Sequence, residues 1–120
     1  MIKYPETDSL LPAYDHALRN VGIEFVTVES PEEMSEAING RTAMVYVVTG
    51  EASEPGSTLS IEVMAEIAGS RGIPILADAA AENLTVPNVH LQQGADVVTY
   101  SGGKALCGPQ CTGLVIGRKD

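Results

Sequence analysis

Two stretches of this 120-residue chain carry side chains that can do chemistry, and each follows an apolar run. The first reads Ser-Gly-Gly-Lys and ends at Lys104, and the second ends at the carboxylate of Asp78, which three alanines follow. A lysine between apolar flanks suits Schiff-base chemistry, because a desolvated amine loses its proton readily. A buried carboxylate with few polar groups near it in the sequence needs a cationic partner.

Both side chains follow runs with the composition of strands. Ligands of open α/β sheets bind at the carboxyl ends of the strands, so we expect Asp78 and Lys104 at one edge of a sheet, facing one cleft. Each stretch also has an ordinary structural interpretation, as a turn or helix-capping aspartate and as a glycine turn with a surface lysine.

Hydrophobic spacing and capping signals predict the elements that position these residues. Ser30, Pro31 and Glu33 form a capping box with proline at the first helical position. The predicted helices are Leu10–Asn20, Ser30–Gly40, Ser60–Arg71 and a short one over Asn88–Gln93. The predicted strands are Ile23–Val28, Thr42–Val48, Ile73–Asp78, Asp96–Tyr100 and Thr112–Gly117.

This alternation predicts an α/β fold with a mostly parallel sheet and helices on both faces. The last connection is too short for a crossover helix, so the final strand should run antiparallel to its predecessor. We expect residues 1–120 to belong to one domain, of which they form a part, and no linker or second domain is visible. The loop over Thr49–Ser57, at another strand's carboxyl end, is either functional or a plain connector.

Composition limits the function classes. The net charge of −9 opposes binding to nucleic acid or to an anionic membrane. No apolar run approaches the roughly 20 residues of a membrane span, and no signal core opens the chain, so we expect a cytoplasmic protein. Cys107 and Cys111 are too few for a zinc site, since His16 and His90 are distant in sequence, and we expect no metal. They are either a free thiol pair or a redox-sensitive pair.

Taken together, the two chemical stretches resemble a known family. The segments Asp78–Glu82, Ser101–Leu106, Gly108–Gln110 and Tyr14–Arg19 are similar to segments of fold type I pyridoxal-phosphate enzymes. Within that fold they most resemble the group of selenocysteine synthase (L-seryl-tRNA selenium transferase) and its small-molecule relatives, such as D-glucosaminate-6-phosphate ammonia-lyase. The resemblance runs along nearly the whole chain and covers only the central part of the large domain of those enzymes.

The resemblance implies pyridoxal 5'-phosphate as cofactor and assigns it four residues. Lys104 would form the Schiff base and move the substrate's α-proton. Asp78 would pair with the pyridinium nitrogen, Ser101 would donate to the phosphate, and Ala80 would pack on the ring. It also suggests that His16 reaches the substrate and that Gln110 contacts a neighbouring subunit of a homo-oligomer, while we expect Glu82 to be solvated.

The implied function is a lyase or transferase that eliminates or replaces a group at the β-carbon of an amino acid or amino sugar acid. The family's phosphate-binding turn and small domain are missing, so we expect part of a longer enzyme that binds cofactor weakly alone. The alternative is a catalytically inactive fragment that serves as a packing or dimerisation module. Transfer RNA as substrate is disfavoured, because the chain is acidic and Gly103 stands where we expect an acidic residue beside the lysine.

Overall fold

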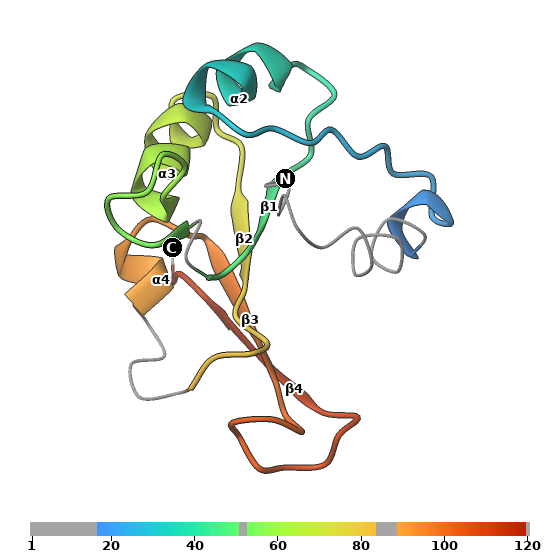
Figure 1. The fold of residues 1–120 in the computed structure, drawn as a ribbon. Helices are drawn as coiled ribbons and strands as arrows, with labels where there is room; N and C mark the ends of the chain where they lie inside the picture. The colour runs from blue at the N-terminus through green and yellow to red at the C-terminus, as the bar shows by residue number, and fades with distance from the viewer. Residues whose placement is uncertain (1–16, 51–52, 84–88, 120) are drawn as a thin grey trace.

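The sheet has four strands in sequence order (Figure 1). A computed structural model describes residues 17–50, 53–83 and 89–119, and its strands are β1 (Val45–Val48), β2 (Ile75–Asp78), β3 (Val97–Ser101) and β4 (Gly113–Gly117). The first three strands are parallel, and β4 pairs antiparallel with β3. The predicted α/β class is therefore confirmed, as is the antiparallel final strand.

The helices α2 (Pro31–Ala37), α3 (Ile61–Gly69) and α4 (Val89–Gln92) connect or flank these strands. The predicted cap forms, because the Ser30 hydroxyl accepts from the Glu33 N–H at 3.2 Å. The return bond differs from a capping box, since the Glu33 carboxylate accepts at 2.7 Å from the N–H of Glu29, one residue before the N-cap. Ser60 caps α3 by accepting from the Val63 N–H at 3.3 Å. No helix in the described ranges combines the length and the hydropathy needed to cross a membrane.

The core lies between the sheet and these helices, which Figure 1 shows on one side of the strands. The prediction of helices on both faces is therefore wrong for α2, α3 and α4. Burial alternates along β1 and β2, with every second side chain facing the core. Crossovers of one hand that step in one direction place their helices on one face, as α3 and α4 do here. The helix predicted over Leu10–Asn20 falls mainly outside the described residues, although residues 17–19 are helical. Strand and helix side chains of the core include Val45, Val47, Ile61, Met64, Ala68, Ile75, Ala77, Val98 and Tyr100.

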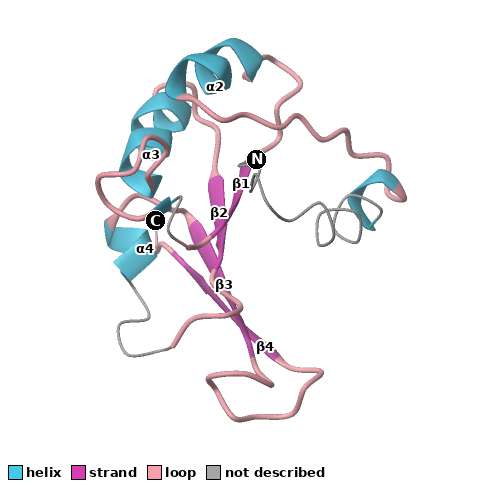
Figure 2. Ribbon diagram, in the orientation of Figure 1, coloured by secondary structure: helices cyan, strands magenta, loops and turns pink. Residues whose placement is uncertain are grey.

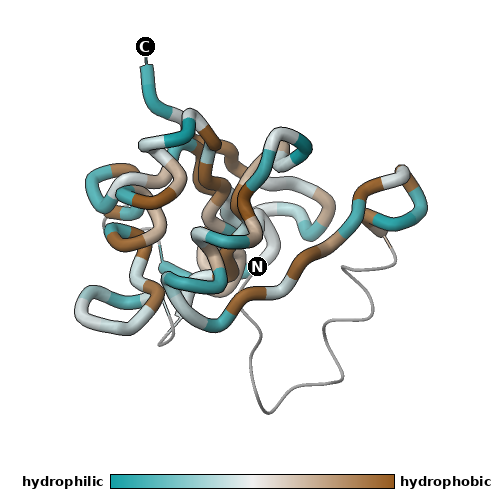
Figure 3. Tube along the Cα trace, turned by 90° about the horizontal axis from the view of Figure 1, so that it is seen from above, coloured by the Kyte–Doolittle hydropathy of each residue, from teal (hydrophilic) through white to brown (hydrophobic). Residues whose placement is uncertain are grey.

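The strand predicted over Ile23–Val28 is wrong. Its backbone is not in a ladder, apart from an isolated bridge at Val28. Ile23 is 47% exposed and Val26 is 54% exposed, and Figure 3 shows this partly hydrophobic segment running away from the rest of the chain. A β-branched run favours extended backbone, but a strand forms only when a neighbour completes its hydrogen bonds. Within the four-stranded sheet, β1 pairs with β2 and not with this segment.

The exposed apolar side chains predict that the 120-residue polypeptide self-associates. On the end strand β4, Val115 is 67% exposed and Leu114 is 37% exposed, and an end strand with apolar side chains templates pairing with another copy. We expect sedimentation velocity to show a larger species as protein concentration rises about tenfold. Val115→Lys should reduce this association, whereas Gln92→Lys, at an exposed polar position of α4, should not. A monomer at every concentration would contradict the prediction.

Candidate functional site

The carboxyl ends of β1, β2 and β3 lie at one edge of the sheet, and both chemical stretches begin there. Val48, Asp78 and Thr99 are lateral neighbours in the ladder, so their side chains share one face. That face is the one opposite the core, and Ser101 lies on it two residues beyond Thr99. The loop that carries Lys104 follows directly and extends beyond the sheet between β3 and β4 (Figure 2). The predicted placement of Asp78 and Lys104 at the same edge thus follows from the observed topology.

Asp78 is held by hydrogen bonds through both its side chain and its backbone. Its Oδ2 accepts from the Tyr46 hydroxyl at 2.7 Å, and its Oδ1 accepts from the Ala80 N–H at 3.0 Å. Its carbonyl accepts from the Thr49 N–H at 2.9 Å, while the next N–H, of Ala79, donates to Thr99 across the sheet. The carboxylate is therefore oriented before any ligand arrives. The hydrogen bond from the Ala80 N–H is the contact that a turn aspartate makes, which is the ordinary structural interpretation of Asp78. The same bond leaves the Asp78 carboxylate in an orientation suited to binding.

Tyr46 is a site residue that sequence reasoning missed. It lies on β1, and its ring also meets Phe25 edge-on, with centroids 6.5 Å apart. In the sequence it reads as one more member of an apolar strand. The sequence does indicate that Tyr46 and Val48 share one face of the strand, because they are two residues apart. Only the ladder register, however, shows that Val48 is the neighbour of Asp78.

Tyr46→Phe should lower the free energy of unfolding by about 1.5–3 kcal/mol. The substitution keeps the ring and removes one donor from a half-buried carboxylate, and hydrogen bonds to charged groups contribute in this range. Urea denaturation measures the change. Phe25→Leu is the matched control, because it removes the ring contact and keeps the hydrogen bond. An unchanged midpoint for Tyr46→Phe would show that the bond is not maintained in solution.

The lysine loop closes on itself at its base. The Gly102 N–H donates to the Thr112 carbonyl at 2.7 Å, and the Gly108 N–H donates to the Gly102 carbonyl at 2.8 Å. A Cβ at Gly102 would lie 2.1 Å from the Thr112 hydroxyl oxygen, and one at Gly103 would lie 2.6 Å from the Gln110 Cα. The two glycines therefore admit the returning limb of their own loop.

Lys104 is exposed, so the enclosure expected from its apolar flanks is wrong. The Lys104 carbonyl accepts from the Cys107 N–H at 2.9 Å in a turn, and Leu106 packs back against the core while Lys104 does not. Leu106 thus anchors the loop without covering the lysine, and Ala105 is exposed. Within the described ranges no hydrogen bond or ion pair engages the amine, which leaves it available for reaction.

The other predicted site residues lie around these two. Ser101 is half-buried at the end of β3, and Ala80 is half-buried in the turn after β2. Gln110 is exposed in the returning limb of the lysine loop. His16 lies outside the described residues. The two cysteines are free and exposed in the same loop, as the thiol-pair interpretation expects.

Glu82 is not a solvated residue, contrary to expectation. Its Oε2 lies 2.7 Å from His90 Nε2, and its side chain is 34% exposed. Burial, and to a smaller extent the charge of Glu82, raises the pKa of Tyr100 above its ordinary value of 10.0. The turn after β2 therefore carries a second carboxylate that is engaged with neighbouring elements.

The raised pKa of Tyr100 predicts a loss of stability in alkali. Below pH about 10 the folded and unfolded states hold the phenolic proton equally, and above it the unfolded state releases the proton first. Stability should therefore fall as pH rises from the ordinary pKa through the raised one. Tyr100→Phe should show a shallower fall in urea midpoint between pH about 9 and about 11. Equal slopes for the two proteins would contradict the assignment.

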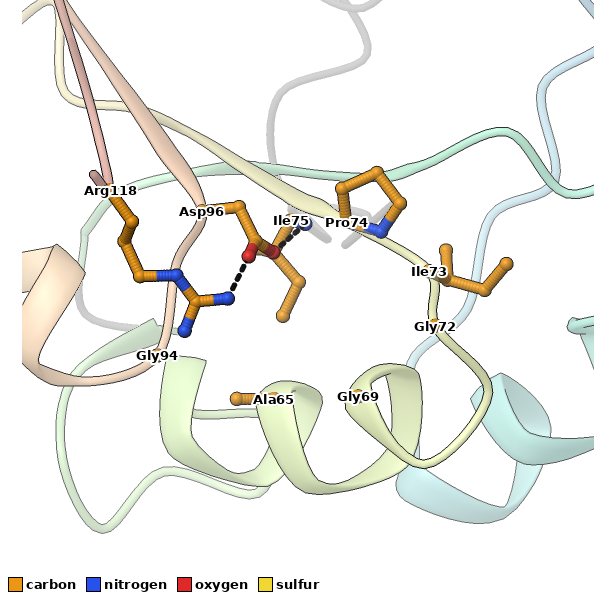
Figure 4. A pocket seen from close by; sticks show the side chains of 9 residues that line it. All are labelled: Ala65, Gly69, Gly72, Ile73, Pro74, Ile75, Gly94, Asp96 and Arg118. Carbon is orange, nitrogen blue, oxygen red and sulfur yellow. Dashed lines mark hydrogen bonds and ion pairs between the residues drawn. The ribbon is translucent and has the colours of Figure 1, made fainter. Parts of the chain in front are cut away.

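A cavity of about 300 Å³ lies at the opposite end of the sheet (Figure 4). Asp96 stands at its centre, where it accepts from the Ile75 N–H at 2.7 Å and pairs with Arg118. These contacts close the amino ends of β2 and β3. The cavity is therefore separate from the edge that carries Asp78 and Lys104, and it is not the cleft expected between them.

Comparison with known proteins gives a consistent set of relatives. The sequence model of the family aminotransferase class-V matches residues 9–120. D-glucosaminate-6-phosphate ammonia lyase of Salmonella typhimurium (strain 14028s / SGSC 2262) is 34% identical over 87 residues, which cover 72% of this chain and 23% of the relative. L-seryl-tRNA(Sec) selenium transferase of Desulfovibrio desulfuricans is 36% identical over 103 residues, covering 73% and 21%. The chain thus spans less than a quarter of the length of these two curated relatives.

Solved structures agree on the fold. A structure of D-glucosaminate-6-phosphate ammonia-lyase superposes with a TM-score of 0.64 at 32% identity, covering 78% of this chain and 27% of that one. Cystathionine gamma-lyase from Lactobacillus plantarum, solved with L-serine, gives a TM-score of 0.67 at 23% identity, covering 91% and 29%. The second likeness concerns the fold alone.

Proposed function

Because this chain belongs to the aminotransferase class-V family, we propose that it is part of the cofactor-binding large domain of a pyridoxal-phosphate-dependent lyase or transferase. The reaction would eliminate or replace a group at the β-carbon of an amino acid or amino sugar acid. The names of the relatives, an ammonia lyase and a selenium transferase, support elimination and replacement as the two reaction types. The observation that supports this most directly is that the oriented carboxylate of Asp78 and the loop of Lys104 follow neighbouring parallel strands.

The described residues fit the ring and the aldehyde of pyridoxal phosphate. An ionised carboxylate accepts up to about four hydrogen bonds, and Asp78 uses two on Tyr46 and Ala80, so it can also accept from a pyridinium N–H. The exposed amine of Lys104 can attach the aldehyde. When bound, this cofactor supplies an electron sink for the substrate's α-carbon.

The phosphate end has fewer partners among the described residues. The space that a side chain would occupy at Gly102 and Gly103 is taken by the returning limb of their loop, so these glycines serve the closure of the loop. Ser101, at the end of β3, is the hydroxyl that we assign to the phosphate. We therefore expect this polypeptide to hold the cofactor weakly unless further residues of a longer protein contribute. Ala80 is assigned to the face of the cofactor ring.

The chain's own residues would carry the proton chemistry. Lys104 would hold the cofactor through its amine, and the same amine would serve as the base toward the α-proton of the substrate. Asp78, fixed by Tyr46 and Ala80, keeps the pyridine nitrogen protonated. Substrate contacts are assigned to His16 and, across a subunit boundary of a homo-oligomer, to Gln110. The net charge of −9 argues for a small amino-acid-like substrate rather than transfer RNA.

A catalytically inactive packing or dimerisation module is the second candidate function. The exposed apolar side chains of β4, Leu114 and Val115, favour it. The two proposals differ in one property, which is selective attachment of the cofactor.

Selective attachment is measured by adding pyridoxal phosphate, reducing with borohydride and mapping the modified peptides. The other lysines of the chain, Lys3 and Lys119, are internal controls for non-specific reaction, and Lys119 is exposed like Lys104. We expect modification of Lys104 at least about tenfold above Lys119, and a reduced preference in Asp78→Ala. Equal modification of Lys104 and Lys119 would favour the inactive module.

A further inference from the structure

His90 is a buried ionisable side chain that the proposed function does not use. It lies in α4, is 8% exposed, and Figure 1 shows that helix beside β3. Its Nδ1 lies 3.0 Å from the Gln93 side-chain oxygen and its Nε2 lies 2.7 Å from Glu82. Both ring nitrogens are thus engaged, as a buried imidazole requires. A four-residue helix has too few hydrogen bonds to hold its own position, so these side-chain contacts help to place it.

The partner of His90 belongs to the turn that orients Asp78. The Glu82 N–H donates to the Ala79 carbonyl at 3.0 Å, and within the same turn the Ala80 N–H donates to Asp78 Oδ1 at 3.0 Å. The backbone of the turn is joined to the sheet by the Ala79 N–H, which donates to Thr99. Ala79, Ala80 and Ala81 have no polar side-chain atoms, so the polar side-chain contacts of the turn come from its two carboxylates. Asp78 ties one end to β1 through Tyr46, and Glu82 ties the other end to α4 through His90.

We propose that His90 is a positioning residue that holds the Asp78–Glu82 turn, and with it the Ala80 N–H, against α4 through the Glu82 carboxylate. An ionised carboxylate only accepts hydrogen bonds, so His90 Nε2 is the donor of this contact. The Gln93 side chain lies on the other side of the ring, 3.0 Å from Nδ1, and the roles in that contact depend on the tautomer. The inference rests on the proposed function where it concerns the cofactor, whereas the tether itself is a property of the chain alone.

Two substitutions separate the tether from ordinary packing. His90→Leu keeps an apolar side chain at the buried position and removes the donor, while His90→Gln retains a donor that can reach Glu82. Ile67→Ala is the matched control, because Ile67 packs on the core from α3 and its apolar side chain has no donor to offer Glu82. The control shows how much a general loss of stability moves each measurement.

The primary measurement is amide hydrogen exchange of Ala80 and Glu82 in the cofactor-free 120-residue chain. We expect His90→Leu to raise both exchange rates about tenfold above Ile67→Ala, after correction for global stability, and His90→Gln to restore most of the protection. Equal rates in His90→Leu and Ile67→Ala would overturn the proposal, as would failure of His90→Gln to restore protection.

The second measurement is the preference for Lys104 over Lys119 in the borohydride assay. The expected result is a preference reduced several-fold in His90→Leu and retained in His90→Gln and Ile67→Ala. If the wild-type chain shows no preference, the proposed function fails while the exchange rates still decide whether His90 positions the turn. If the preference exists and His90→Leu leaves it intact, the role of His90 toward the cofactor is refuted although Lys104 attachment stands.

Discussion

Gly102→Ala is expected to abolish the preferential attachment of pyridoxal phosphate to Lys104. The new Cβ would lie 2.1 Å from the Thr112 hydroxyl oxygen and 2.6 Å from the Thr112 carbonyl oxygen. Because one of these atoms is backbone, a side-chain rotation cannot relieve the contact, and the two limbs of the loop must separate. Overpacking of this kind costs about 1–3 kcal/mol, and here it breaks the hydrogen bonds that close the loop at its base.

Borohydride labelling and urea denaturation together measure this effect. The preference for Lys104 over Lys119 should disappear, and the urea midpoint should fall because the end of the β3–β4 pair, at Ser101 and Gly113, is disturbed. Gly40→Ala is the matched control, since a Cβ there meets no atom within 4 Å. A Gly102→Ala protein with wild-type labelling and stability would show that the loop adopts another closure in solution.

Gly94→Ala is expected to lower the free energy of unfolding by about 2–6 kcal/mol, through two separate effects of one methyl group. Gly94 has a φ of +114°, which side chains disfavour, and its Cβ would lie 2.5 Å from the Ala65 Cβ on α3. The backbone conformation costs about 1–3 kcal/mol and the overpacking about 1–3 kcal/mol more. Their sum is a large share of a typical domain stability of about 5–15 kcal/mol.

A double-mutant cycle separates the two contributions. Ala65→Gly alone should cost about 1 kcal/mol through helix propensity. Combined with Gly94→Ala it should be stabilising, because it removes the atom that the new methyl group meets, and the cost of the positive φ should remain. Urea denaturation of the four proteins gives the coupling energy. Additive changes would mean that α3 and the turn after α4 separate freely and do not pack as closely as the structure shows.

Elements with local signals were predictable from the sequence. Ser30 and Ser60 each cap the helix that follows, and such caps depend on residues within one turn. Strand composition was less informative, since Ile23–Val28 and Thr42–Val48 are both β-branched and apolar. Only part of the second became a strand, because pairing depends on neighbours that composition does not specify.

The candidate site was predictable where the chemistry is carried by single residues and not where it depends on contacts. Asp78 and Lys104 were identified from residue type and strand ends. Tyr46 was missed because it meets Asp78 from 32 positions away in sequence, through a register that period two alone does not fix. The exposure of Lys104 was missed because Leu106 packs against the core without covering the lysine, while Ala105, Leu114 and Val115 are themselves exposed.

The strand order of the sheet also bears on how the chain folds. Because β1, β2, β3 and β4 are adjacent in space in the order in which they occur in sequence, each new strand adds to its immediate predecessor. Such an arrangement keeps the contact order low for a parallel sheet, so each strand pairing closes only a short loop and loses little chain entropy. The unit from β2 to β4 contains both Asp78 and Lys104, so the strand pairings that bring these two residues to one edge join segments that are consecutive along the chain.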